Sequence, residues 1–225
     1  MKSYYIYFIR NGMTAEINEG QYIGHTDVPL SEAGEKQLLQ MKESYEYPEP
    51  EVVFTSPLKR CVRTAQLLYP DTDCIPMRDL MEYDFGEFEG KTAEELEEHP
   101  VFARWLAGEP GVQPPFGESN EDFQRRVCGC FCKIVEGLFK TGMTKAAIVT
   151  HGGVISTLLS CYGLPEAPMH EWMMPDGCGY CVRITPMLWS GGQKMEVFDE
   201  LPIVPRVPED EDIFKDFHVE DFLYD

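Results

Sequence analysis

The sequence predicts a three-layer α/β/α sandwich around a mostly parallel sheet. Strand-like segments alternate with helix-like segments along the chain, which is the order expected of parallel strands joined by helical crossovers. The segment 145–150 is an apolar run with one charge, typical of a central strand buried on both faces. No internal repeat or linker divides the chain. We therefore expect one α/β domain over residues 1–198 and an acidic C-terminal extension over residues 199–225.

The first half of the chain provides three strands and two helices of this pattern. Residues 4–9 and 51–55 are rich in aromatic and β-branched side chains, as strands prefer, and 74–80 is interpreted as a third strand. Residues 31–45 are expected to form a helix that Ser31 caps. Residues 59–68 form a second predicted helix, which Pro70 ends.

The second half repeats the alternation. Residues 92–107 are predicted to form one or two helical pieces, and the Pro- and Gly-rich segment 108–117 is predicted to be a loop. The longest predicted helix covers 119–140, where apolar residues recur at helical spacing. A further helix is expected at 154–161, after the central strand, and late strands at 179–185 and 194–198.

Composition excludes several classes of partner. The 225 residues carry 19 Lys and Arg against 39 Asp and Glu, a formal charge of −20, so nucleic acids and anionic membranes are poor partners. No apolar run is long enough to span a membrane, and the N-terminus lacks the features of a signal peptide. We expect a cytoplasmic protein whose eight cysteines are reduced.

The cysteines and the C-terminal segment suggest no cofactor. The pairs Cys128–Cys132 and Cys178–Cys181 are interpreted as small buried side chains rather than metal ligands, so neither a metal nor a cofactor is expected. Residues 199–225 hold ten acidic side chains and two basic ones, and no role is predicted for them. The oligomeric state is not predicted either.

Charged and polar side chains follow four of the predicted strands. Arg10 and Asn11 end the first strand, Arg60 follows the second, Glu82 the third, and His151 with Gly152 the central one. Active sites of open α/β sheets form at the carboxyl ends of strands, so these groups should converge. Arginine suits bidentate recognition of phosphate, and a helix beginning after His151 would point backbone N–H groups at an anion. These residues predict a phosphoryl-binding pocket.

The motifs around these residues resemble those of one family. They are Phe8-Ile-Arg-Asn-Gly-Met-Thr14, Gly20-Gln-Tyr-Ile-Gly24, Thr26-Asp-Val-Pro-Leu-Ser31, Thr55-Ser-Pro-Leu-Lys-Arg60, Glu82 with Phe85-Gly-Glu-Phe-Glu-Gly90, Gly117-Glu-Ser119 and Val149-Thr-His-Gly-Gly153. In this order they resemble the histidine phosphatase superfamily, also called phosphoglycerate-mutase-like, over roughly residues 3–190. Within the family the chain resembles the phosphatase branch, which includes α-ribazole phosphatases, sugar-bisphosphate phosphatases and broad-specificity phosphatases, and the sequence does not choose among them.

The resemblance implies a site and a reaction. In the family a histidine in an Arg-His-Gly motif attacks the phosphoryl group, and water then hydrolyses the phosphohistidine. Carried over, Arg10, Arg60, His151 and Gly152 bind phosphate and Glu82 protonates the leaving oxygen. The expected ligand is a small phosphorylated metabolite or inorganic phosphate.

Two positions depart from the family pattern. Asn11 occupies the position of the nucleophilic histidine, and its amide nitrogen is a poor nucleophile because its lone pair is delocalised. Ile17 replaces an expected phosphate-contacting Asn, with Asn18 beside it; Ile23 and Gly24 are further candidates for substrate contact. Asn11 is compatible with an engineered change or with a natural relative that has lost or altered its catalysis, and the sequence does not choose.

Three functions are therefore compared. The first is a phosphomonoesterase scaffold whose turnover is abolished or impaired by Asn11. The second is an inactive protein that binds a phosphorylated ligand or regulates through it. The third, a phosphoglycerate mutase, is disfavoured because the segment 91–117 offers only Lys91, His99 and Arg104 to hold a substrate carboxylate.

Overall fold

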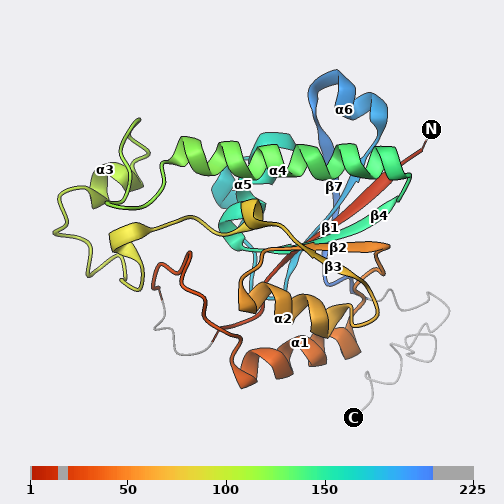
Figure 1. The fold of residues 1–225 in the computed structure, drawn as a ribbon, viewed down its shortest axis with the longest axis horizontal. Helices are drawn as coiled ribbons and strands as arrows, with labels where there is room; N and C mark the ends of the chain where they lie inside the picture. Colours follow the sequence, from red (N-terminus) through yellow and green to blue (C-terminus); the bar gives the residue numbers. More distant parts are fainter. Residues whose placement is uncertain (1, 15–19, 205–225) are drawn as a thin grey trace, which may run out of the picture.

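The computed structural model describes residues 2–14 and 20–204, which form one mixed seven-stranded sheet with helices on both faces (Figure 1). The strand order is β3-β2-β4-β1-β6-β7-β5. The strands are β1 (Tyr4–Arg10), β2 (Val52–Thr55), β3 (Cys74–Pro76), β4 (Lys145–Thr150), β5 (Gly163–Leu164), β6 (Gly179–Ile184) and β7 (Met195–Leu201). Only β6 runs against its neighbours β1 and β7, so the prediction of a mostly parallel α/β sheet is confirmed.

Six α-helices and three short 3₁₀ helices lie within the described ranges. They are α1 (Glu32–Ser44), α2 (Lys59–Leu68), α3 (Phe102–Leu106), α4 (Asn120–Thr141), α5 (Gly152–Tyr162), α6 (Pro186–Gly192), η1 (Arg78–Leu80), η2 (Gly86–Phe88) and η3 (Met169–Trp172). Ser31 caps α1 by accepting from the Gly34 N–H, as predicted. No helix in this part of the chain has both the length and the apolar content needed to cross a membrane.

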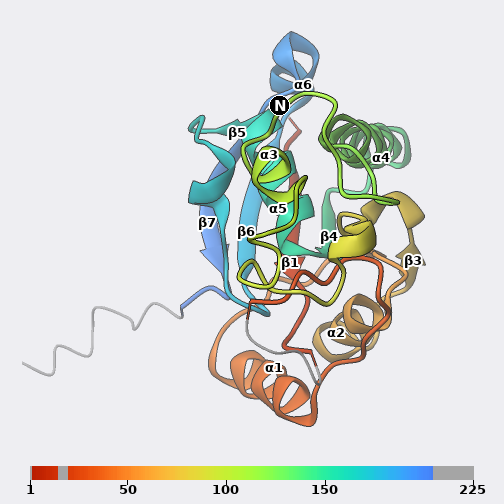
Figure 2. The same ribbon diagram turned by 90° about the vertical axis from the view of Figure 1, so that its left-hand side faces the viewer.

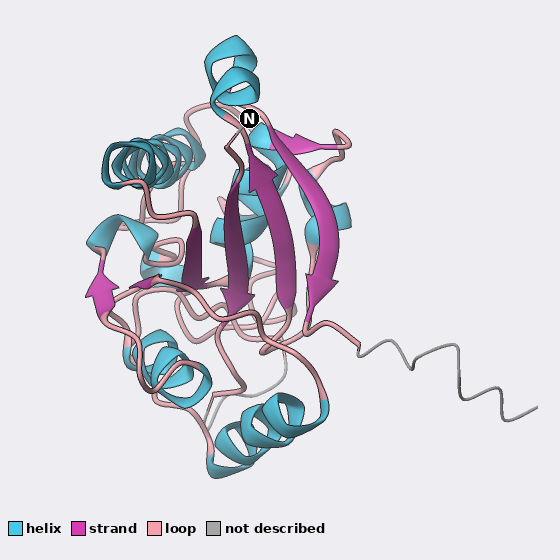
Figure 3. Ribbon diagram, turned by 90° about the vertical axis from the view of Figure 1, so that its right-hand side faces the viewer, coloured by secondary structure: helices cyan, strands magenta, loops and turns pink. Residues whose placement is uncertain are grey.

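Alternation along the central strands creates two hydrophobic layers. On β1, Ile6 and Phe8 pack with side chains of α4 and α5, whereas Tyr7 and Ile9 pack with side chains of α2. Figure 1 shows the result: α4 lies above the sheet, and α1 and α2 lie below it. Figure 3 shows the strands from one side as a twisted row. This arrangement is the predicted three-layer sandwich.

Several predicted elements differ from the observed ones. The strand predicted at 74–80 ends at Pro76, and η1 follows, because only residues 74–76 pair with β2 at the edge of the sheet. In 92–107 only Phe102–Leu106 is α-helical. The structure also contains β5, α6 and η3, which were not predicted because each is too short to show a clear hydrophobic periodicity. Strand β7 continues to Leu201 and so includes the first residues of the predicted extension, whereas 205–225 lie outside the described residues.

The loops that follow the parallel strands gather at one edge of the sheet. Strands β1, β2 and β4 run parallel, so residues 10–12, 56–60 and 150–152 lie together there. Figure 2 faces this edge, and shows the yellow-green segment that carries α3 crossing in front of the sheet. A small aromatic cluster holds this segment in place: Phe102 and Trp105 of the segment pack with Tyr22 and Phe88. These side chains form a small core in the part of the chain that covers the pocket.

The core around α4 generates a stability prediction. Phe131 of α4 is fully buried and packs against Phe8 and Trp189, whereas Phe198 of β7 is half exposed and contacts Tyr5. Phe131→Ala should lower the free energy of unfolding by about 3–5 kcal/mol, because it removes a large apolar group and leaves a cavity. The control Phe198→Ala should cost less than about 1 kcal/mol. Urea denaturation of both variants measures this difference, and equal losses would contradict the assigned core.

Candidate functional site

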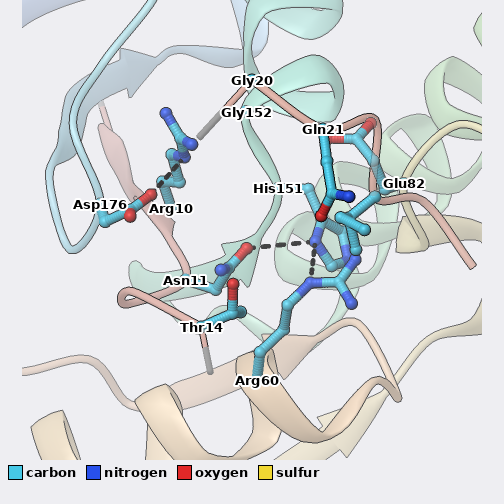
Figure 4. Close-up of a pocket in the computed structure, with 11 residues that line it drawn as sticks. Arg10, Asn11, Thr14, Gly20, Gln21, Arg60, Glu82, His151, Gly152 and Asp176 are labelled. Carbon is cyan, nitrogen blue, oxygen red and sulfur yellow. Dashed lines mark hydrogen bonds and ion pairs between the residues drawn. The ribbon is translucent and has the colours of Figure 1, made fainter. Parts of the chain in front are cut away.

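A cavity of about 350 Å³ opens at the edge where the parallel strands end, as Figure 4 shows. Its lining contains most of the residues singled out from the sequence: Arg10, Asn11, Ile23, Arg60, Glu82, His151 and Gly152. The same lining includes Thr14, Gly20 and Gln21, which lie in the quoted motifs but were assigned no role, and Asp176, which was not singled out from the sequence. Ile17 and Asn18 lie outside the described residues. Gly24 does not line the cavity, but its backbone carbonyl accepts a hydrogen bond from Arg60, which does.

His151 forms the buried floor of the cavity, at the point where β4 passes into α5. Arg60 Nε lies 3.3 Å from His151 Nδ1, and because a guanidinium can only donate, Nδ1 must accept. The ring proton is therefore on Nε2, which donates to Ser56 Oγ at 2.8 Å. Burial, and then the charge of Arg60, hold the pKa of His151 well below its usual range, so the ring is neutral at pH 7.

Asn11 lies beside His151 on the same floor. It is 8% exposed, and its Oδ1 lies 3.2 Å from His151 Nδ1, while its Nδ2 donates to the Gly12 carbonyl at 2.9 Å. The Gly12 N–H in turn donates to Thr64 Oγ1 of α2, which fixes the turn after β1. Asn11 is thus held next to the two groups that the sequence assigns to phosphate binding, Arg60 and His151.

Arg60 comes from the first turn of α2 and is almost completely buried. Besides His151 it donates to the carbonyls of Gly24 and Thr26, at 2.7 and 2.9 Å, and so fixes the segment that follows residue 20. This segment is also held by Glu89, whose carboxylate accepts from the N–H groups of Gly24 and His25. No role was predicted for Glu89, because the backbone groups that it binds are distant in sequence.

Arg10 is oriented differently from Arg60. Its Nε lies 2.9 Å from the Asp176 carboxylate, and its Nη1 donates to the Met174 carbonyl at 2.6 Å. Figure 4 shows Arg10 and Asp176 side by side, on the opposite side of the pocket from Arg60. Arg60 makes no ion pair with a carboxylate in the described ranges, whereas the charge of Arg10 is partly balanced by Asp176.

Glu82 is buried against the first turn of α5, where its Oε2 accepts from the Gly153 N–H at 3.0 Å. A Cβ at residue 153 would lie 2.5 Å from Glu82 Oε1, so only glycine permits this approach. Burial raises the pKa of the Glu82 carboxyl, although the two backbone hydrogen bonds it accepts, from Tyr83 and Gly153, oppose the rise. A raised pKa favours the protonated form of this carboxyl, the form that a general acid requires.

A second set of contacts fixes the backbone of Glu82. Arg126 of α4 donates to the carbonyls of Asp79, Met81 and Glu82 and pairs with Glu118. Glu118 also accepts from the Asp84 N–H. The Gly-Glu-Ser motif at 117–119 thereby positions the Glu82 segment, because its Ser119 caps the helix that carries Arg126. Arg126 was not predicted: it is one of two adjacent arginines within a helix, and nothing in the sequence distinguishes its role from that of Arg125.

An apolar cavity of about 580 Å³ adjoins the first one and shares Glu82 with it. Aromatic side chains form much of its lining: Tyr22, Tyr83, Phe85, Trp105 and Phe123. It is continued along α5 by Gly153, Thr157, Ser160 and Cys161. The combined site thus has a polar end at Arg60 and His151 and an apolar end beyond Glu82. No group of three His, Cys, Asp or Glu side chains in residues 2–14 and 20–204 could hold a metal ion.

Comparison with known proteins agrees with this architecture. An uncharacterized phosphatase, PhoE, of Bacillus subtilis is 29% identical over 183 residues, which cover 80% of this chain and 89% of that protein. The adenosylcobalamin/α-ribazole phosphatase of Escherichia coli is 26% identical over 185 residues, with coverage of 80% and 89%.

Solved structures show the same fold. The α-ribazole phosphatase of Shigella flexneri superimposes with a TM-score of 0.73 at 22% identity, covering 90% of this chain and 97% of that one. A phosphoglycerate mutase of Thermus thermophilus superimposes with a TM-score of 0.63 at 30% identity, with coverage of 87% and 97%.

The model of the histidine phosphatase superfamily (branch 1) matches residues 6–191, which include every cavity residue named from the sequence. The strand order, the pocket at the carboxyl ends of the parallel strands and this match lead to one conclusion. The chain belongs to the histidine phosphatase superfamily.

Proposed function

We propose that this chain binds a small phosphomonoester or inorganic phosphate in the polar cavity and hydrolyses it slowly or not at all. The observation that carries the proposal is Asn11, which lies on the buried floor 3.2 Å from His151. An amide there can donate to a phosphoryl oxygen but cannot form the covalent intermediate that divides the displacement into two steps. The phosphatase names of the relatives support the same class of ligand.

The proposed binding mode uses the polar end of the site. Arg60 and the first turn of α5 at Gly152 provide donors and positive potential for phosphoryl oxygens. Neutral His151, whose Nε2–H is held by Ser56, orients Arg60 through Nδ1. Arg10 contributes once its contact with Asp176 is loosened. Glu82, whose pKa is raised by burial, is placed between the two cavities and would protonate the leaving oxygen.

The adjoining apolar cavity favours a leaving group with aromatic or apolar surface rather than a carboxylate. The bases that a mutase would require are engaged elsewhere: Arg104 pairs with Glu109 through two hydrogen bonds, and His99 packs against Phe88. Neither residue lines the polar cavity. These contacts support the binding of a phosphomonoester over the activity of a phosphoglycerate mutase.

Restoring the family nucleophile tests the proposal. Asn11→His should raise the rate of p-nitrophenyl phosphate hydrolysis on the order of 10³-fold or more, because it supplies the missing nucleophile. A phosphorylated protein should then be trapped by acid quenching and intact mass. Asn11→Gln is the matched control, since it changes side-chain length without adding a nucleophile, and should stay at the background rate. Equal hydrolysis by the unaltered chain and Asn11→His, or none by a folded Asn11→His, would contradict the proposal.

The Arg10–Asp176 contact generates a prediction on affinity. Asp176→Asn should tighten inorganic phosphate binding roughly two- to fivefold, because it removes a half-exposed carboxylate that competes with phosphate for Arg10. Asp73→Asn, which removes an exposed carboxylate just before β3, controls for net charge. Isothermal titration calorimetry measures both dissociation constants. Unchanged or weaker binding in Asp176→Asn would show that Asp176 does not compete.

The neutral state of His151 predicts a pH dependence of stability. The folded protein binds the His151 proton less tightly than the unfolded chain does, because the folded pKa is lowered. The unfolded chain gains that proton as pH falls below about 6.5, so stability from this group is present at pH 7 and lost towards pH 5, by up to about 1.4 kcal/mol per pH unit. In urea titrations at pH 7, 6 and 5, His151→Gln should lose less stability than the unaltered chain. Parallel losses would contradict a neutral buried His151.

A further inference from the structure

Cys161 and Cys128 form a thiol pair at the wall of the apolar cavity. Cys161 lies in the last turn of α5 and lines the cavity, and Cys128 lies on α4, which packs against α5. Cys128 shares one face of α4 with Gln124 and Cys132, and Cys132 Sγ lies 3.7 Å from the hydroxyl of Tyr162, the residue after Cys161. Cys128 therefore lies on α4 between the two residues that contact Cys161 and Tyr162. Gln124, one helical turn before Cys128, donates its Nε2–H to Cys161 Sγ at 3.0 Å. Cys161 is therefore reached from the cavity on one side and contacted by α4 on the other.

We propose that Cys161 is a reactive thiol and Cys128 its resolving partner, so that a hydroperoxide converts the pair to a disulfide joining α5 to α4. Cys161 sulfur attacks the peroxide O–O bond and becomes a sulfenic acid, releasing one water from hydrogen peroxide. Cys128 sulfur then attacks the sulfenic sulfur, the S–S bond forms, and the hydroxyl leaves with the Cys128 proton as a second water. Two thiols lose two electrons in total, and one peroxide is reduced to two waters.

The surroundings of Cys161 favour its thiolate. The hydrogen bond from the Cys128 thiol, the amide of Gln124 and the charge of Lys194 lower the pKa of Cys161 to about 6, although burial opposes this. Lys194 is itself paired with Glu166 at 2.7 Å.

Tyr162, the residue after Cys161, also acts on Cys128. Tyr162 of α5 and Cys132 of α4 lie against each other, and burial raises the pKa of the Tyr162 hydroxyl. The pKa of Cys128 is raised by its bond to Cys161 and by burial, so Cys128 keeps the proton that it donates. The pair thus has one deprotonated and one protonated sulfur, the combination needed for attack followed by resolution.

The remaining cysteines lack this combination. Cys61, Cys130 and Cys181 are buried, and burial raises the pKa of each. Cys74 and Cys178 are partly accessible, but burial raises the pKa of both. Cys161 differs from these five thiols because its pKa is lowered. The proposal concerns thiol chemistry alone and does not depend on phosphate binding.

Alkylation kinetics test the reactivity of Cys161. The unaltered chain, treated with iodoacetamide from pH 5 to 9 and mapped by peptide mass spectrometry, should label Cys161 with a midpoint near pH 6. At pH 6 its rate should exceed that of a thiol of ordinary pKa about tenfold, after the lower intrinsic nucleophilicity of its thiolate is allowed for. Gln124→Leu should move the midpoint upward by removing a donor. A Cys161 midpoint above pH 8 in the unaltered chain would overturn the proposal.

Peroxide oxidation tests the partner. Limited hydrogen peroxide should link the tryptic peptide 127–133 to the peptide that contains Cys161. Because the first peptide holds Cys128, Cys130 and Cys132, and the second, 146–183, holds Cys161, Cys178 and Cys181, serine variants assign the bond. Cys161→Ser should lose the link, whereas Cys178→Ser and Cys181→Ser should keep it. Cys132→Ser, one helical turn from Cys128, should keep the link. Cys128→Ser should lose it and leave a Cys161 sulfenic acid that dimedone captures. A link that survives in Cys128→Ser, or oxidation that joins other cysteines in the unaltered chain, would overturn the assignment.

Discussion

The contact between Arg60 and His151 is the interaction on which the rest of the site depends. A guanidinium with 3% exposure has to satisfy its donors inside the protein, and Arg60 does so with one histidine and two backbone carbonyls. These partners come from the end of β4 and from the segment after residue 20, so one side chain joins α2, β4 and the cover of the pocket. The same contact fixes the ring proton of His151 on Nε2 and helps to keep the ring neutral.

A neutral His151 and a partly balanced Arg10 make the pocket less positive than its residue types suggest. Arg60 is left as the main cation facing the cavity, and the first turn of α5 adds N–H dipoles. This resolves an apparent conflict in the composition. A chain of net charge −20 is unsuited to polyanions, yet one buried arginine with oriented donors is enough to attract a single phosphoryl group.

Much of the fold and many of the pocket residues could be predicted from the sequence, because both follow from short-range pattern. The apolar run at β4 and the capped helix α1 have clear local signals, and parallel strands bring residues 10, 60 and 151 to one edge by geometry alone. Glu82 reached the cavity by another route, through η1 and the hydrogen bonds from Arg126, rather than from the end of a strand. Asp176 and Arg126 could not be found in this way, since their roles depend on partners more than 40 residues away.

The geometry of the site requires a neutral His151 that accepts from Arg60 through Nδ1 and donates through Nε2. The most direct test is the ¹⁵N chemical shifts of its ring nitrogens, measured in the labelled chain from pH 8 to 5.5 and assigned by comparison with His151→Gln. We expect a protonated Nε2 and an unprotonated Nδ1 throughout this range, with no change to imidazolium. A ring that becomes doubly protonated above pH 5.5, or one that carries its proton on Nδ1 towards Asn11, would contradict it.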